Sequence, residues 1–279
     1  MSSLVSIIVP TFNHEKYVYE NLSSILSQDY KNYQVIIVND GSIDSTANVI
    51  KEFIAEKNCQ DWVFIDRKEN KGLIFSLKEA FSYVQGEYIS LVASDDFWAD
   101  SKLSEQVNVL EQNEDINLVF TDYYDVNEKS QIIRLNCARK RFIEFDDVLH
   151  GVSLPPASLM FRKNSFIDDF DAISDLIVED LFIWLSCLQE EGKKAYIISK
   201  PLVFYRYHES NTTSKFRIRV LDDHYRIVSY FEKKKSNKNG CPYWALRNFD
   251  QLSRRQKKEA FFYMKKCLAL FYSPRCCKI

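Results

Sequence analysis

Short apolar runs alternate with longer segments of helical periodicity in the first hundred residues, and this alternation restricts the fold more than any other feature of the chain. The apolar runs cover residues 6–10, 34–40, 63–67 and 87–93, and the helical segments cover 15–27, 45–57 and 72–84. Continuous apolar runs of this length are typical of strands buried on both faces. Alternation of such strands with helices indicates βαβ units. We therefore predict an α/β fold with a Rossmann-like, mostly parallel central sheet flanked by helices.

The rest of the chain continues this pattern less regularly. It predicts helices over 102–111 and 179–190, strands over 118–124, 159–162, 195–199 and 202–207, and an irregular stretch or hairpin over 125–150. Beyond Arg217 the sequence is helical and basic, with a loop predicted over 233–242. We expect residues 1–217 to form one α/β domain and residues 218–279 to form a helical, basic C-terminal extension.

Polar residues follow three of the predicted strands at the points where these strands end. They are residues 11–13 after the first strand, 39–42 after the second and 94–96 after the fourth. In open α/β sheets, ligands bind outside the carboxyl ends of the strands. The three clusters are therefore expected to converge on one edge of the sheet and to form a binding site there.

Asp95 and Asp96 are adjacent carboxylates at the end of a predicted buried strand. Neighbouring carboxylates repel each other, so a cation beside them favours the state in which both are ionised. Carboxylate oxygens together with a diphosphate suit Mg²⁺ or Mn²⁺. Such an ion would neutralise charge that develops on a departing nucleoside diphosphate. The structural alternative is a solvated acidic loop or the start of a helix, where aspartate is common.

Three other positions have both a functional and a structural interpretation. Asp40 can bind a base or a ribose hydroxyl, or it can be a turn residue, because Asp-Gly is a frequent turn pair. Asp180, with Glu179 beside it, can act as a general base, or the two can stabilise a helix N-terminus. His208 or Arg206 can contact a diphosphate, or they can be a loop histidine and a structural ion-pair partner. The residues alone favour the turn at Asp40 and the helix N-terminus at Glu179 and Asp180, and they leave the alternatives for His208 and Arg206 open.

Several other chemistries lack their residue patterns. The four histidines have no metal-ligand spacing, and the seven cysteines form no CxxC pair, which argues against a zinc site and a disulfide framework. The sequence has no GxSxG, no Walker loop and no GxGxxG, so nucleophilic-triad, P-loop and classical dinucleotide chemistry are not expected. His14, His150 and His224 receive no functional assignment from the sequence.

Taken in order, the segments described above resemble the inverting family 2 glycosyltransferases of the GT-A fold. The matching segments are 5–13, 34–46, 69–72, 86–98, 102–103, 158–162, 179–180 and 205–211. Each segment alone is weak, but their order and spacing over residues 1–215 make the resemblance specific. It implies that residues 1–217 are a GT-A catalytic domain, and it does not extend to the tail beyond residue 220.

The resemblance also implies a role for each matching residue. Residues that would contact the nucleotide-sugar are Pro10, Thr11, Asn13, Asp40, Lys71, Gly72, Asp95 and His208. Asp40 would bond the base, and His208 would belong to a loop that closes over the diphosphate. Asp96 would be the direct ligand of Mn²⁺ or Mg²⁺, with Asp95 the lesser ligand and nearer the ribose. Asp180 would be the catalytic base, and Glu179 would orient the acceptor or the base.

The chain departs from the family pattern at one position of the acidic motif. The commoner form is Asp-x-Asp-Asp, and Ala93 stands where the first Asp is expected. This weakens the expected ribose contact more than the expected metal contact. The sequence also lacks a Gln-x-x-Arg-Trp segment, which argues against a processive polysaccharide synthase and for transfer of a single sugar.

Charge is distributed unevenly along the chain. The formal net charge is −2, yet from Tyr225 onward there are 14 Lys and Arg against 3 Asp and Glu. Such a segment indicates an anionic surface or partner. For residues 254–279, contact with an anionic membrane and packing on the body both stay open.

No apolar run approaches the roughly 18 residues of a membrane span. The scattered cysteines suit a reducing compartment. These two features predict a cytoplasmic protein, or one that is peripheral on the cytosolic face of a membrane. No nucleic-acid partner is expected.

The sequence therefore predicts a metal-dependent enzyme that moves one sugar, with inversion, from an NDP-sugar to a hydroxyl. UDP is the expected nucleotide, and a glycan or lipid-linked glycan of cell-surface polysaccharide biosynthesis is the expected acceptor. One alternative is a metal-dependent nucleotidyltransferase, which would need a glycine-rich basic loop after the first strand. The other is a non-catalytic glycan-binding or scaffold relic of the fold, for which Ala93 is the only indication.

Overall fold

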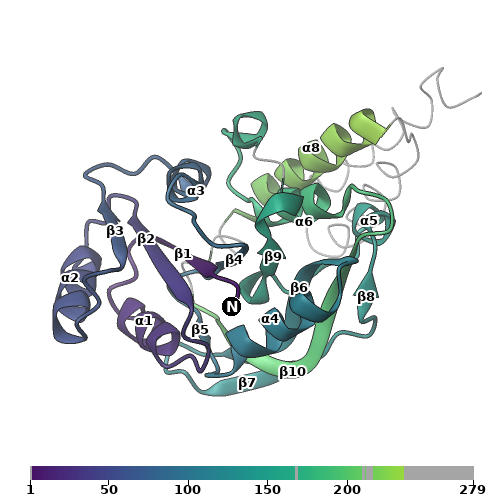
Figure 1. Ribbon diagram of the computed structural model, residues 1–279. Coiled ribbons are helices and arrows are strands. Elements are labelled where there is room, and N and C mark those ends of the chain that lie inside the picture. Colours follow the sequence, from purple (N-terminus) through teal and green to yellow (C-terminus); the bar gives the residue numbers. More distant parts are fainter. Residues whose placement is uncertain (1, 167–168, 209–210, 212–215, 236–279) are drawn as a thin grey trace, which may run out of the picture.

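The computed structural model describes residues 2–166, 169–208, 211 and 216–235 (Figure 1). Its strands are β1 (Val5–Thr11), β2 (Tyr33–Asn39), β3 (Val63–Asp66), β4 (Tyr88–Leu91), β5 (Phe97–Trp98), β6 (Ile116–Val126), β7 (Ile132–Asn136), β8 (Phe142–Ile143), β9 (Met160–Arg162) and β10 (Lys194–Arg206). Its α-helices are α1 (Val18–Leu26), α2 (Thr46–Glu56), α3 (Leu73–Phe81), α4 (Lys102–Gln112), α5 (Phe145–Leu149), α6 (Asp180–Leu188) and α8 (Arg217–Lys235). Three short 3-10 helices are η1 (Pro156–Ser158), η2 (Lys163–Ser165) and η3 (Phe170–Ile173).

The strands form one sheet in the order β3-β2-β1-β4-β9-β6-β10-β5, with β7 paired to β6 and β8 paired to β10. β1, β2, β3 and β4 pair in parallel, as do β6 and β10. β9 lies between β4 and β6 and is antiparallel to both. Because two strands antiparallel to the same neighbour run the same way, β4 and β6 share one direction. The long strands therefore all point toward one edge, and the predicted α/β fold with a mostly parallel sheet is confirmed.

Side chains of the central strands alternate between two cores, one on each face of the sheet. In β1, Ile8 belongs to the first core, whereas Ile7 and Val9 belong to the second. Successive side chains of a strand point to opposite faces, so a strand buried on both faces reads as a continuous apolar run. Helices α3, α5, α6 and α8 cover the first core, and α1, α2 and α4 cover the second (Figure 1). This two-sided burial explains the apolar runs of the sequence.

The second half of the sheet differs from the predicted elements. The expected strands 195–199 and 202–207 are one strand, β10, whose pairing with β6 shifts register on either side of Pro201. Proline cannot donate a ladder hydrogen bond, so it is tolerated at such an irregularity. The stretch expected to be irregular or a hairpin contains the β6–β7 hairpin, β8 and α5.

Helix α8 packs against the first core. Ile227, Val228 and Phe231 are buried there, and the Phe231 ring lies 5.4 Å from the Phe182 ring of α6. The Asp223 carboxylate accepts a hydrogen bond from the backbone N–H of Ile177 at 2.8 Å. The first part of the predicted extension is therefore attached to α6 and to the segment before it.

Two expectations for the tail fall outside the described residues. They are most of the loop predicted over 233–242 and the whole of the segment 254–279, for which membrane contact and packing on the body were both kept open. Within the residues that the structure describes, no helix has the length and apolar character needed to cross a membrane.

Candidate functional site

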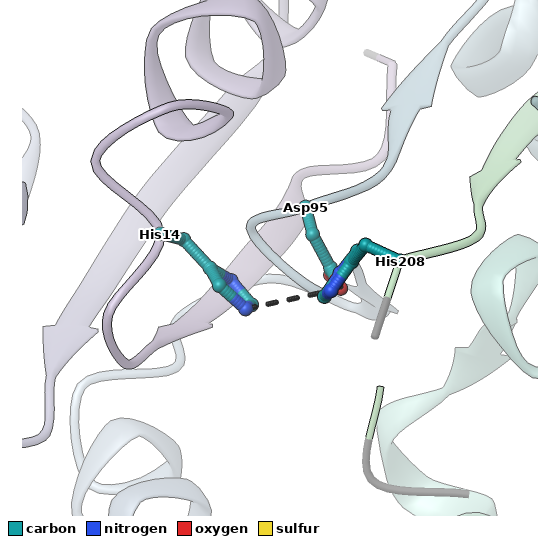
Figure 2. Close-up of side chains that lie close together, drawn as sticks. All are labelled: His14, Asp95 and His208. Carbon is teal, nitrogen blue, oxygen red and sulfur yellow. Dashed lines mark hydrogen bonds and ion pairs between the residues drawn. The ribbon is translucent and has the colours of Figure 1, made fainter. Parts of the chain in front are cut away.

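Three polar side chains meet at the carboxyl edge of the sheet. His14 comes from the segment after β1, Asp95 from the segment after β4, and His208 from the segment after β10 (Figure 2). Figure 2 shows the three side chains pointing toward one another. One ligand atom from each lies within 4.8 Å of the other two. The segments that follow β1 and β4 therefore meet, as predicted, and the end of β10 adds His208 to them.

Asp95 is the centre of this cluster. Its Oδ2 lies 2.8 Å from His208 Nε2 and 3.8 Å from His14 Nε2. His14 Nδ1 lies 2.8 Å from the hydroxyl of buried Ser94, which fixes the ring with Nε2 toward Asp95. His208 is held through its backbone N–H, which donates to Asn211 Oδ1 at 2.6 Å. The three ligating atoms are thus positioned by contacts outside the cluster.

The surroundings of the cluster favour the ionised form of Asp95 and the neutral form of His14 in comparison with the free side chains. Burial works against ionisation of Asp95, but the hydrogen bond from His208 and the charges of both histidines hold its pKa below the ordinary value. Burial lowers the pKa of His14, and Asp95 offsets this only in part. Among the described residues, Asp95 Oδ1 is buried without a hydrogen-bond partner. A neutral imidazole and an unsatisfied carboxylate oxygen are what a divalent cation requires.

Asp96 is oriented differently from Asp95. Its Oδ1 accepts a hydrogen bond from the backbone N–H of Arg206 at 2.8 Å, and the residue is 2% exposed. Burial and the neighbouring charge of Asp95 raise the pKa of Asp96 well above its ordinary value. The family resemblance implies Asp96 as the direct metal ligand, and this stays a prediction. The group of possible ligands that lie close together among the described residues contains Asp95 and two histidines, whereas one oxygen of Asp96 is engaged with the end of β10.

Arg206 is a buried hub beneath the cluster. Its Nε donates to the Asp95 carbonyl at 2.7 Å, and its Nη2 donates to Glu20 Oε2 at 2.6 Å. Its Nη1 donates to the carbonyl of Asn127 and to the hydroxyl of Ser130, at 3.1 and 3.0 Å. The structural interpretation of Arg206 as an ion-pair partner is therefore confirmed.

Arg206→Lys is expected to lower the free energy of unfolding by about 2–3 kcal/mol, because one ammonium cannot replace the guanidinium fork and leaves buried acceptors unsatisfied. Urea unfolding followed by circular dichroism measures the change. The matched control is Arg134→Lys, whose exposed side chain pairs with Asp125, and a smaller loss is expected there. An equal loss in both variants would contradict the role of Arg206 as a hub.

Asp40 holds the loop that carries Lys71 and Gly72. Its carboxylate accepts the backbone N–H of Lys71 at 2.9 Å and that of Gly72 at 2.8 Å, and it pairs with Arg67 Nη1 at 2.9 Å. Gly41 has φ +66°, and a Cβ on it would lie 2.4 Å from the carbonyl carbon of Glu69. Only glycine permits this approach. Asp40, Lys71 and Gly72 therefore lie together, as expected, and contact with a base stays a prediction.

The remaining nucleotide positions lie in and after the end of β1. Pro10 and Thr11 are the last two residues of the strand, and Thr11 is buried. Asn13 has φ 54°, and its Oδ1 accepts the backbone N–H of Ile43 at 2.9 Å. In return, the backbone N–H of Asn13 donates to the Ser42 hydroxyl at 2.9 Å. The first two predicted polar clusters therefore contact each other directly.

A second acidic group lies at the N-terminus of α6. Glu179 is the N-cap residue but makes no side-chain capping hydrogen bond, and Asp180 is the first helical residue. Asp180 Oδ1 lies 2.7 Å from the N–H of Leu181 and 3.6 Å from Nε2 of His224 on α8. Burial and the charge of Asp180 raise the pKa of Glu179 to about 8. Capping by Glu179 therefore does not account for this pair of carboxylates.

Glu179→Gln is expected to stabilise the fold in alkaline solution. A raised pKa means that the folded state prefers protonated Glu179, so its stabilising contribution is complete below the unfolded value of 4.5 and is lost as pH rises through about 8. Glutamine keeps the uncharged form, so the gain at pH 9 is about 2 kcal/mol, reduced from the full linkage value because the side chain is partly solvated.

Thermal unfolding at pH 5 and pH 9 measures the gain in stability of Glu179→Gln over the wild type. This gain is expected only at pH 9. The control is Glu190→Gln near the other end of α6, where the carboxylate is exposed. A gain of the same size for both variants, or one independent of pH, would contradict the assignment to Glu179.

Sequence reasoning missed two histidines of these groups. His14 directly follows the first polar cluster, so its place after a strand end was a usable signal. His224 lies in the segment to which the family resemblance does not extend, and it reaches Asp180 only through the packing of α8 on α6. No local pattern marks such a contact.

The sequence profile of glycosyl transferase family 2 matches residues 6–169 of this chain. A relative from Rickettsia typhi, named as an uncharacterised glycosyltransferase, is 29% identical over 245 residues, which are 84% of this chain and 73% of the relative. Escherichia coli WfgD, named UDP-Glc:alpha-D-GlcNAc-diphosphoundecaprenol beta-1,3-glucosyltransferase, is 26% identical over 219 residues, which are 77% of this chain and 81% of the relative.

Solved structures share the fold at low sequence identity. Residues 1–349 of S. aureus TarS superpose with a TM-score of 0.70 at 17% identity, covering 96% of this chain and 79% of that chain. Their complex with UDP-GlcNAc gives 0.61 at 15% identity, covering 96% and 89%. Mannosyltransferase PcManGT from Pyrobaculum calidifontis, in complex with GDP-Man and Mn²⁺, gives 0.57 at 16% identity, covering 98% and 81%.

Proposed function

Since this chain belongs to glycosyl transferase family 2 and has the GT-A fold, we propose that it transfers one sugar, with inversion, from a UDP-sugar to an acceptor hydroxyl. The observation that carries this proposal is the cluster of His14, Asp95 and His208 at the carboxyl edge of the sheet. Ligands of open α/β sheets bind at that edge. Among the described residues, this cluster is the one group of three possible metal ligands that lie close together. A diphosphate bound at that edge would lie beside it.

The choice of uridine rests on the relatives and on the Asp40 loop. The name of WfgD gives UDP-Glc as its donor, and a TarS structure is a complex with UDP-GlcNAc. In this chain, three donors occupy the Asp40 carboxylate. Asp40 therefore fixes the loop of Lys71 and Gly72, and we assign the nucleoside contact to this loop as a whole, together with Asn13.

The residues of the cluster fit a divalent cation. Asp95 would hold it through the buried Oδ1 that has no partner among the described residues, together with His14 and His208. Two imidazole nitrogens and one carboxylate suit Mn²⁺ better than Mg²⁺, which prefers oxygen ligands. When bound, the ion supplies positive charge against the leaving diphosphate. Mn²⁺ is therefore the expected cofactor, as in the PcManGT complex.

Asp180 is the proposed base. As the acceptor oxygen forms its bond to the anomeric carbon, the bond from that carbon to the diphosphate oxygen breaks, and the acceptor proton passes to the Asp180 carboxylate. One displacement of this kind inverts the anomeric centre. The helix dipole favours an ionised carboxylate at the first position of α6. Glu179, whose pKa is raised to about 8, keeps a proton at neutral pH and can donate a hydrogen bond to the acceptor or to Asp180.

The proposed acceptor is a lipid-linked glycan of cell-surface polysaccharide synthesis. WfgD is named for an undecaprenol diphosphate acceptor, and TuaG of Bacillus subtilis is named for teichuronic acid biosynthesis. An acceptor linked to a lipid is anchored in a membrane, so we propose a cytoplasmic protein with peripheral membrane contact through the basic segment. This segment carries 14 Lys and Arg from Tyr225 onward.

A nucleotide screen by thermal shift tests the proposal. UDP with Mn²⁺ at about 100 times its dissociation constant is expected to raise the melting temperature by about 5–10 °C. GDP, CDP and UDP without metal are expected to give less, and Mg²⁺ is expected to be weaker than Mn²⁺. UDP release from UDP-Glc and UDP-GlcNAc then identifies the donor. A protein that no nucleoside diphosphate stabilises with either metal would refute the proposal.

A further inference from the structure

His224 occupies an unusual place on helix α8. Ile227, Val228 and Phe231 follow it at spacings of three, four and seven residues, and all three are buried in the first core. Residues at these spacings share one face of a helix. His224 therefore continues the core-facing stripe, where an apolar side chain would ordinarily stand, and its side chain is 25% exposed. An ionisable ring on this face requires an explanation.

The ring is directed at the N-terminus of α6. His224 Nε2 is a buried atom and lies 3.6 Å from Asp180 Oδ1. Two contacts of α8 fix this approach. Asp223, the preceding residue, accepts the backbone N–H of Ile177 at 2.8 Å. Phe231 packs against Phe182 of α6 at 5.4 Å between ring centroids. The histidine is therefore held between two anchors, one on each side of it along α8.

We propose that His224 is a positioning residue for the Asp180 base, in that its ring holds the carboxylate in one orientation. The proposal rests on the proposed function, which makes Asp180 the base. Asp180 Oδ1 accepts the N–H of Leu181 at 2.7 Å and lies 3.6 Å from His224 Nε2. A ring fixed by the anchors of α8 at this distance limits the rotation of the carboxylate.

Other charged groups around His224 are already paired. On α8 itself, Asp223 bonds the N–H of Ile177 and lies 4.0 Å from Arg226. Arg226 also pairs with Asp175 at 2.8 Å, from the segment before α6. On α6, the Asp180 carboxylate lies 3.6 Å from the ring. Asp180 is therefore the carboxylate on which removal of the ring is expected to act most directly.

The first test does not depend on sugar transfer. The ring signal of His224 is recorded by NMR in the labelled full chain at a single pH, and it is assigned by its loss in His224→Gln. Asp180→Asn is expected to move this signal, because an amide replaces the carboxylate 3.6 Å from the ring. The control Asp175→Asn removes a carboxylate that pairs with Arg226 of the same helix, and no such movement is expected. An unmoved signal in Asp180→Asn would overturn the proposal.

The second test separates positioning from mere structural support. UDP release from UDP-GlcNAc with Mn²⁺ is measured with water as the acceptor. His224→Phe is expected to lower kcat about tenfold with little change in KM. His224→Gln is expected to recover most of kcat. Lower thermal stability with unchanged kcat would overturn the proposal. Absence of UDP release in wild type would instead refute the proposed function, and the NMR test would still decide the pairing.

Discussion

Asp180→Asn is expected to lower kcat by about 10²- to 10⁴-fold, the usual contribution of a positioned general base. Asparagine keeps the size of the side chain and can still accept the N–H of Leu181, but it cannot take the proton of the acceptor hydroxyl. Because Asp180 is not a member of the cluster of His14, Asp95 and His208, UDP binding in the presence of Mn²⁺ is expected to stay unchanged. Initial rates of sugar transfer and UDP titrations by calorimetry measure both quantities.

Asp175→Asn is the matched control for Asp180→Asn. Asp175 precedes α6 by a few residues and pairs with Arg226 on the surface, so its removal is expected to leave kcat within about twofold, as for most exposed ion pairs. If Asp180→Asn kept full turnover, another group would have to be the base. If it lost UDP binding together with turnover, its effect would be structural rather than catalytic.

Asp95→Asn is expected to remove the Mn²⁺ dependence of UDP binding and to lower sugar transfer by about a thousandfold, a typical loss when charge stabilisation of a leaving group is removed. The amide can still accept a hydrogen bond from His208, so the local fold is expected to persist. The amide is a weaker metal ligand than the carboxylate, and its NH₂ group would take the place of the buried carboxylate oxygen. Calorimetric titration with UDP, with and without Mn²⁺, measures the loss.

Asp96→Asn is the control that separates the two adjacent carboxylates. The Asp96 oxygen that accepts the N–H of Arg206 is retained in asparagine, so the contact with the end of β10 is expected to persist. We therefore expect Mn²⁺-dependent UDP binding to survive in Asp96→Asn. The reverse result, loss in Asp96→Asn and retention in Asp95→Asn, would support the ligand assignment made from the sequence.

The elements of the first hundred residues could be predicted because their signal is local. The apolar runs and the helical spacing of α1, α2 and α3 depend on neighbours within one turn or one strand. The convergence of residues 11–13, 39–42 and 94–96 followed from one rule about parallel sheets. The family resemblance then indicated Asp180 as a catalytic residue, although Glu179 and Asp180 alone favoured a helix cap.

The remaining features depend on contacts between distant parts of the chain. β9 enters the sheet between β4 and β6, an arrangement set by the packing of both strands. His14, Asp95 and His208 come from segments 80 or more residues apart, and no spacing rule relates them. The contact of Asp96 with the N–H of Arg206 is supplied by the end of β10, 110 residues away. Local sequence could propose the acidic pair but could not show that the two carboxylates have different neighbours.

The attachment of α8 to α6 affects where the catalytic unit of this chain ends. A boundary at residue 217, drawn from the extent of the family resemblance, would remove the helix that covers one side of the first core and carries His224. A chain shortened there would expose Phe182 and the partners of Ile227 and Val228 to water. The shortest self-sufficient version of this enzyme is therefore expected to continue through α8, to residue 235. The helix that begins the basic segment would then serve two purposes, completing the hydrophobic core at its start and leading toward the charged tail at its end.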